Sequence, residues 1–125
     1  MSDNILEVRD LKMHFPDGSE GIFGGKKKYI YAIDGISFDI AKGETLGLVG
    51  ESGCGKSTVV RTVSQLYKPT AGKVLLDGKD LTKMKKSEMI AVRRDMQLVF
   101  QDPYSSLDPR MTTSEIIAEP MRIYK

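Results

Sequence analysis

Apolar and polar positions alternate in short runs along the first third of the chain. The runs cover Ile5 to Val8, then Leu11, Met13 and Phe15. They predict one or two half-buried strands, and strand character resumes from Tyr29 to Ile40. Between these strands, the segment from Pro16 to Lys28 carries four glycines, a proline and three consecutive lysines. We expect it to form a flexible surface loop.

Two compact apolar runs differ from this alternation. TLGLV, from Thr45 to Val49, and MQLVF, from Met96 to Phe100, predict strands buried on both faces of a parallel sheet. A glycine-rich segment follows the first run, and apolar residues then recur at helical spacing from Ser57 to Tyr67. Lys68 and Pro69 are expected to end that helix.

Shorter signals mark the remaining elements. Lys73 to Leu76 followed by Asp77-Gly78 predicts one arm of a hairpin and its turn. A short helix is expected from Ser87 to Arg94. The two prolines and the lack of periodicity in QDPYSSLDPRM predict a loop over residues 101–111.

A last helix is expected to run through Ile123. Thr112 and Glu115 have the spacing of a capping box at its start, and Pro120 is expected to kink it.

Composition narrows the class of protein. A chain of 125 residues holds one domain at most, and 40% hydrophobic with 29% charged residues is typical of folded proteins. The net charge of +2 is too small for a nucleic-acid footprint. With Cys54 and His14 as single examples of their kind, neither an intrachain disulfide nor a cysteine and histidine zinc site is possible. The chain has no apolar run that spans a bilayer and no signal-peptide pattern at its start, which favours the cytosol.

One motif carries chemistry. Residues 50–57 fit GxxxxGK[ST], the phosphate-binding P-loop, with a chance expectation of roughly 0.4% in a chain of this length. A predicted strand before it and a helix after it supply the required context. The alternative is a glycine-rich turn into a helix with an exposed lysine. The candidate nucleotide-binding residues are Gly50, Glu51, Ser52, Gly53, Cys54, Gly55, Lys56, Ser57 and Thr58.

The chemistry of the motif assigns a role to each polar group. Backbone N–H groups of the loop and the positive end of the following helix surround phosphate oxygens. Lys56 is expected to reach the β and γ phosphates, Ser57 to hold Mg²⁺, and Thr58 to bond the α phosphate. Cys54 is interpreted as a small loop residue beside the phosphates, because a catalytic thiol needs a base and His14 is the one histidine.

Gln101 follows the second predicted buried strand, at the strand end where ligands bind in open α/β sheets. Its amide oxygen could hold a metal ion or water. On position alone, an ordinary loop glutamine is the better interpretation.

Taken together, LGLVGESGCGKST, PTAGKVLLDGKDL, MQLVFQDPYSSLDPRMT and IIAEP resemble the ATP-binding subunits of ABC transporters, most closely those of oligopeptide and dipeptide importers. The resemblance runs from about Leu6 to the last residue. It implies an α/β fold, a P-loop NTPase (RecA-like) core with an antiparallel β subdomain, incomplete at the C-terminus. Residues 1–125 would be the amino-terminal portion of the ATP-binding domain.

The resemblance also implies roles for residues outside the P-loop. Gln101 would be the Q-loop glutamine, which senses Mg²⁺ and the γ phosphate. The segment from Asp102 to Met111 would couple it to the membrane subunits. An aromatic residue that stacks on adenine corresponds best to Phe15, with Tyr29 and Tyr31 as rivals.

Four features of the family are absent from the sequence: the LSGGQ-type signature, the Walker B aspartate, the catalytic glutamate after it, and the switch histidine. The family's missing sheet strands would lie between the two buried strands, so we expect those strands to face a gap. Because the signature and the catalytic glutamate are absent, we expect the chain alone to be inactive.

In the complete protein, the resemblance implies that ATP held between two ATP-binding subunits, identical or different, is hydrolysed to power peptide import from the inner face of the cell membrane. Nickel or another small solute is an alternative cargo. The alternative function is a truncated chain that only binds nucleotide or an ABC partner. An unrelated small P-loop kinase conflicts with the Q-loop segment.

Overall fold

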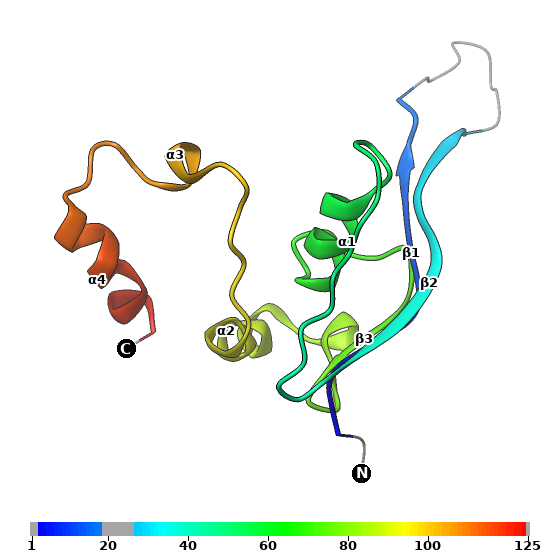
Figure 1. Ribbon diagram of the computed structural model, residues 1–125, viewed down its shortest axis with the longest axis horizontal. Helices are drawn as coiled ribbons and strands as arrows, with labels where there is room; N and C mark the ends of the chain where they lie inside the picture. The colour runs from blue at the N-terminus through cyan, green and yellow to red at the C-terminus, as the bar shows by residue number, and fades with distance from the viewer. Residues whose placement is uncertain (1–2, 19–26, 125) are drawn as a thin grey trace. The chain divides into compact units, whose positions relative to one another are not determined.

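The computed structural model describes residues 3–18 and 27–124 and divides the chain into two units (Figure 1). We call Met1–Lys86 unit 1 and Ser87–Lys125 unit 2. The part of the predicted loop from residue 19 to residue 26 lies outside the described residues.

Unit 1 is built on a four-stranded antiparallel sheet with the order β2-β1-β3-β4. The strands are β1 (Asn4–Pro16), β2 (Tyr29–Ala41), β3 (Ala71–Leu76) and β4 (Lys79–Asp80). The expected strands at the start of the chain are therefore confirmed, as one long strand and its partner. Because β1 pairs on both sides, the middle of the core lies along it.

A bulge in β1 explains its apolar pattern. Val8 and Leu11 are both fully buried, although a spacing of three residues should place them on opposite faces of a regular strand. The pairing of β1 with β2 shifts register between these residues, and Asp10 has a φ of 45°. The extra residue resets the alternation, so Leu11 returns to the core face.

The hairpin of β3 and β4 confirms the turn expected at Asp77-Gly78. Both residues have positive φ, 47° and 78°, as a two-residue type I′ turn requires. Asp80 then caps the short helix η1 (Leu81–Lys83), since its carboxylate accepts a hydrogen bond from the N–H of Thr82 at 3.0 Å. This turn places Leu81 in the core.

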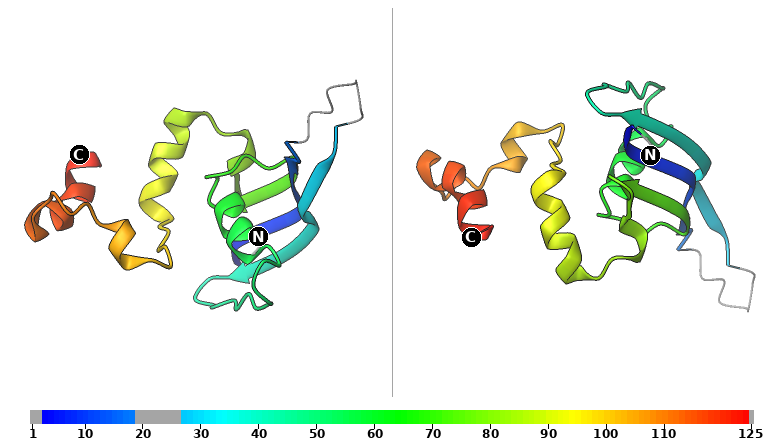
Figure 2. Two further views of the ribbon diagram at one scale, coloured as in Figure 1. Left: turned by 90° about the horizontal axis from the view of Figure 1, so that it is seen from above. Right: turned by 90° about the horizontal axis from the view of Figure 1, so that it is seen from below.

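Helix α1 (Lys56–Val63) lies on one face of the sheet and buries Val59 and Thr62 (Figure 2). It ends earlier than expected. Gln65 adopts a φ of 60°. Its N–H donates to the carbonyl of Thr62 at 3.1 Å, and the N–H of Leu66 donates to the carbonyl of Arg61 at 2.9 Å. These bonds form a Schellman motif, which ends the helix before Lys68 and Pro69 are reached.

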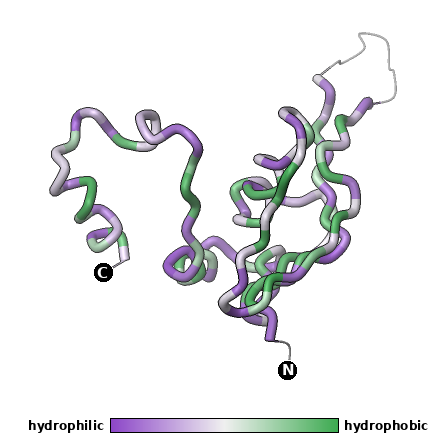
Figure 3. The backbone as a smooth tube through the Cα atoms, viewed as in Figure 1, coloured by the Kyte–Doolittle hydropathy of each residue, from purple (hydrophilic) through white to green (hydrophobic). Residues whose placement is uncertain are grey.

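The prediction of buried strands over Thr45–Val49 and Met96–Phe100 is wrong. Neither segment has regular secondary structure, and Val49 and Val99 are 91% and 92% exposed. A strand needs a neighbouring strand for its backbone hydrogen bonds, and neither segment has one among the described residues. The segment after α2 appears as a hydrophobic stretch in Figure 3.

Unit 2 consists of short helices. Helix α2 (Lys86–Asp95) matches the expected helix to within one residue at each end. Helix α3 (Pro103–Ser106) forms one turn inside residues 101–111, which were expected to be a loop. The reason is local, because Asp102 caps the turn and proline suits its first position.

The last helix, α4 (Thr113–Ile123), confirms the expected capping box. Thr112 N–H donates to the Glu115 carboxylate at 2.7 Å, and Glu115 N–H donates to the Thr112 hydroxyl at 3.3 Å. Pro120 lies inside the helix. In the described part of the chain, no helix is both long and apolar enough to cross a membrane.

Candidate phosphate-binding site

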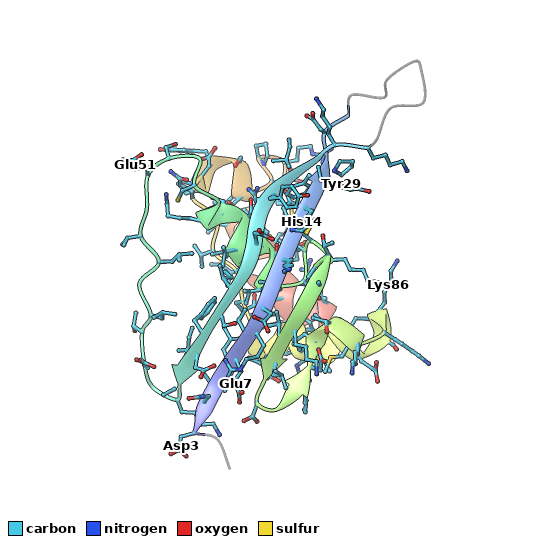
Figure 4. All side chains as sticks on the ribbon, turned by 90° about the vertical axis from the view of Figure 1, so that its right-hand side faces the viewer. Asp3, Glu7, His14, Tyr29, Glu51 and Lys86 are labelled. Atoms are coloured by element: carbon cyan, nitrogen blue, oxygen red, sulfur yellow. The ribbon has the colours of Figure 1, made fainter. Side chains whose placement is uncertain are left out.

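The loop of residues 50–55 leads directly into α1 in unit 1. The predicted helix after the motif is thus present, whereas the predicted strand before it is not. Figure 4 shows Glu51 of this loop at the same end of unit 1 as Tyr29, where β2 begins. The loop therefore stands at the end of the sheet where β1 ends and β2 starts.

The first turn of α1 presents backbone donors without a side-chain cap. Gly55 is the N-cap residue and has no side chain to accept from them, and the first intrahelical bond there runs from the N–H of Val59 to the carbonyl of Gly55 at 2.9 Å. The N–H groups of Lys56, Ser57 and Thr58 precede that bond and have no intrahelical acceptor. Together with the helix dipole, they favour an anion at this end.

Gly55 is required by the fold as well as by the motif. Its φ is 98°, and a Cβ atom there would lie 2.8 Å from the carbonyl oxygen of Ala32 in β2. Any side chain would therefore push the loop away from the sheet. The missing side chain thus allows the start of α1 to lie this close to β2.

The Lys56 side chain curls back over the loop. Its Nζ donates to the carbonyl oxygens of Gly50 and Glu51 at 2.5 and 2.7 Å and lies 3.5 Å from the Cys54 sulfur. Cys54 N–H also donates to the Glu51 carbonyl at 3.2 Å, which closes the loop as a turn. The positive charge of Lys56 thus lies near the positive end of the helix dipole, and both favour a bound anion.

The other residues of the motif are accessible. Glu51, Ser52, Gly53, Cys54 and Ser57 are exposed, whereas Thr58 is half-buried. The structure therefore brings together all the residues expected to contact phosphate, from Gly50 to Thr58. Among the described residues there is no group of three or more His, Cys, Asp or Glu side chains placed to hold a metal ion.

Phe15 lies in the same unit, at the end of β1, and pairs with Ile30 of β2. Its ring meets that of Tyr67 edge to face, with centroids 5.5 Å apart and planes at 86°. The rival Tyr31 instead contacts the His14 ring at 4.4 Å, and Tyr29 is about half exposed. The sequence pattern predicts Tyr67 only as the last apolar position of the helix after the motif. Nothing in that pattern indicates a contact with Phe15.

Gln101 belongs to unit 2 and is exposed, directly before the Asp102 cap of α3. Hydrogen bonds from the backbone N–H groups of Ser105 and Tyr104 lower the pKa of the Asp102 carboxyl. Asp108 accepts hydrogen bonds from the side chain and the N–H of Arg110, and these lower its pKa as well. The segment from Asp102 to Met111 is therefore a series of turns held by local hydrogen bonds.

Comparison with known proteins identifies the family of the chain. The sequence model of the family described as ABC transporter matches residues 33–124. The chain is 54% identical over 122 residues to the oligopeptide transport ATP-binding protein OppF of Salmonella typhimurium, covering 96% of this chain and 36% of that protein. It is 50% identical over 123 residues to the oligopeptide transport ATP-binding protein AppF of Bacillus subtilis, covering 98% and 37%. The chain spans about a third of the length of these relatives.

A solved structure shares the fold. It is the dimeric, post-hydrolysis state of the ATP-binding cassette MJ0796 bound to ADP and Pi. The TM-score is 0.80 at 27% sequence identity, and the match covers 96% of this chain and 48% of that chain. The fold is therefore that of part of an ABC cassette, with the expected antiparallel sheet.

Proposed function

Since this chain belongs to the ABC transporter family, we propose that the loop from Gly50 to Ser57 binds the phosphates of ATP. One observation carries the proposal: Lys56 holds its ammonium over the loop through the carbonyls of Gly50 and Glu51, beside the uncapped start of α1. A polyphosphate would exchange those carbonyls for charged oxygens, which bind an ammonium group more strongly.

The side chains next to Lys56 suit Mg²⁺. The exposed hydroxyl of Ser57 is a hard oxygen donor, and Mg²⁺ in such sites takes few protein ligands besides water and phosphate oxygens. When bound, the ion neutralises charge on the β and γ phosphates. Ser57 would hold it, and Phe15 would stack on the adenine base.

For the whole protein, we propose that ATP hydrolysis powers peptide import. The support is the identity of 50% and 54% to proteins named for oligopeptide transport. A second ATP-binding subunit is proposed because the structurally similar cassette MJ0796 is dimeric. The segment from Asp102 to Met111 would contact the transporter's membrane subunits, which would place the protein at the inner face of the membrane.

The phosphate site is tested by titration with Mg-ATP, which measures the affinity of the protein as its host produces it. Lys56→Ala should lose most of its Mg-ATP affinity, because the phosphates lose their cationic partner. Gln101→Ala should stay within a few fold in affinity and lose turnover, measured as phosphate release. Lys79→Ala, which removes an exposed lysine of β4, is the matched control. Unchanged ATP binding by Lys56→Ala would refute the proposal.

A further inference from the structure

The ring contact between Phe15 and Tyr67 joins two elements that are distant in sequence. Phe15 is close to the end of β1, whereas Tyr67 follows α1, the helix that starts at the phosphate-binding loop. Both side chains are half-buried, and their planes are nearly perpendicular. This geometry is one of the preferred arrangements of aromatic pairs.

The end of the strand that carries Phe15 is irregular. The pairing of β1 with β2 shifts register between Met13 and His14, directly before Phe15. Such irregularities redirect the side chains that follow them. The position of the Phe15 ring thus depends on an irregular strand end and on whatever contacts the ring itself.

Hydrogen bonds hold both ends of the connection that carries Tyr67. Its N–H donates to the carbonyl of Arg61 in α1 at 3.1 Å. Farther along, Thr70 is bonded to β1 twice: its N–H donates to the Lys12 carbonyl at 2.8 Å, and its hydroxyl accepts from the N–H of His14 at 2.9 Å. The connection that carries Tyr67 is therefore tied to α1 at its start and to β1 at its end.

We propose that Tyr67 is a positioning residue that sets the plane of the Phe15 ring for stacking on the base of the bound nucleotide. The inference rests on the proposed function, in which Phe15 contacts adenine. In an edge-to-face pair, at least one face of the Phe15 ring is left uncovered by its partner. Rotation of Phe15 away from that plane would break the pair, so Tyr67 stabilises one orientation.

The arrangement links both ends of a nucleotide to one helix. The first turn of α1 would hold the phosphates, and the residues after its Schellman motif would orient the base platform. Replacement of Tyr67 should therefore change the affinity for a nucleotide, whereas the affinity for a polyphosphate without a base should not change.

The test compares Mg-ATP with magnesium tripolyphosphate, which keeps the phosphates and lacks the base. In the naturally expressed protein, Tyr67→Leu should weaken ATP binding about threefold to tenfold. Its tripolyphosphate affinity should stay unchanged. Tyr67→Phe keeps the ring and should bind both like the parent. Ile90→Ala, at a side chain of α2 that is 59% exposed, is the control.

Phe15→Leu separates the possible failures. It should show the same selective loss for ATP, and the double variant Phe15→Leu with Tyr67→Leu should be no weaker than Phe15→Leu alone. A selective loss in Phe15→Leu without one in Tyr67→Leu would overturn the inference and leave the proposed function standing. Equal loss for both ligands in Tyr67→Leu would also overturn it, because that pattern indicates damage to α1. Failure of Lys56→Ala to weaken either ligand would instead refute the proposed function.

A measurement on the parent protein covers the case in which Tyr67→Leu does not fold. Ring resonances of Phe15 and Tyr67 should both shift on addition of Mg-ATP, and should not shift on addition of magnesium tripolyphosphate. A shift of Phe15 alone would overturn the inference.

Discussion

Unit 1 buries apolar side chains that come from distant parts of the sequence, whereas the hydrogen bonds of the caps and turns of unit 2 join residues only two to four positions apart. The buried apolar residues of unit 1 come from both long strands, α1, β3 and η1. They are Val8, Leu11, Ile33, Val59, Val74 and Leu81. In the described part of unit 2, Val92 alone is a buried apolar residue.

The difference separates two ways of placing site residues. The loop proposed to bind phosphate in unit 1 is placed by long-range packing, such as the approach of Gly55 to Ala32. The segment after Gln101 in unit 2 is held by caps, with Asp102 bonded to Tyr104 N–H at 2.9 Å and Asp108 to Arg110 N–H at 2.9 Å. Damage to the core should therefore reach the phosphate site, whereas damage to a cap should stay local.

The largest expected effect is that of a cavity in unit 1. Leu11→Ala removes a fully buried side chain from the central strand and should lower the free energy of unfolding by about 2–5 kcal/mol. Ile117→Ala in α4 is the matched change at a side chain that is 64% exposed, and should cost less than about 0.5 kcal/mol. Denaturant unfolding of the 125-residue chain measures both. Equal losses would show that α4 is as well packed as the sheet.

A glycine pair tests the backbone of unit 1. Gly72 in β3 has a φ of 93°, and a Cβ there would lie 2.7 Å from the Arg9 carbonyl oxygen and still closer to that of Asp10. Gly72→Ala should therefore destabilise the sheet by about 1–3 kcal/mol more than Gly78→Ala, whose added Cβ meets open space. Thermal unfolding of the two variants gives the difference. If they unfold alike, the contact between β1 and β3 at this point is looser than described.

Removal of a cap should have a smaller effect that is confined to unit 2. Thr112→Ala deletes the hydroxyl that accepts from Glu115 N–H and should weaken α4 by about 1 kcal/mol. Amide hydrogen exchange should speed up in α4 and stay unchanged in β1 and α1. Faster exchange in unit 1 would show that the two units unfold together, contrary to the comparison.

The smallest effect should appear in acid. Hydrogen bonds from Thr112 lower the pKa of Glu115 below its ordinary 4.5, and those from Ser105 and Tyr104 lower that of Asp102 below 3.8. A carboxyl with a lowered folded pKa contributes its stability above the ordinary value and loses it as pH falls through the folded value. Helical signal from unit 2 should therefore be constant above about pH 5 and decline as the pH falls further. In Glu115→Gln, the α4 part of that decline should disappear.

The local elements were predictable because their determinants lie close together in sequence. The capping box of Thr112 and Glu115, the turn at Asp77-Gly78 and the course of α2 all appear where the pattern predicts them. The motif from Gly50 to Ser57 is of the same kind, since eight consecutive residues carry its loop and the start of its helix. The one-turn helix α3 was missed although its Asp-Pro start was visible.

Other features depended on partners that no local pattern specifies. The apolar runs at Thr45–Val49 and Met96–Phe100 have strand composition but no neighbouring strand in the described residues, so they form no strand. The contact of Phe15 with Tyr67 likewise required β1 and the end of α1 to be brought together. The sequence by itself determined the caps, the turns and the loop of residues 50–55, because their hydrogen bonds close within a few residues. Pairing of strands and rings joins distant residues, and only the tertiary structure decided which of them meet.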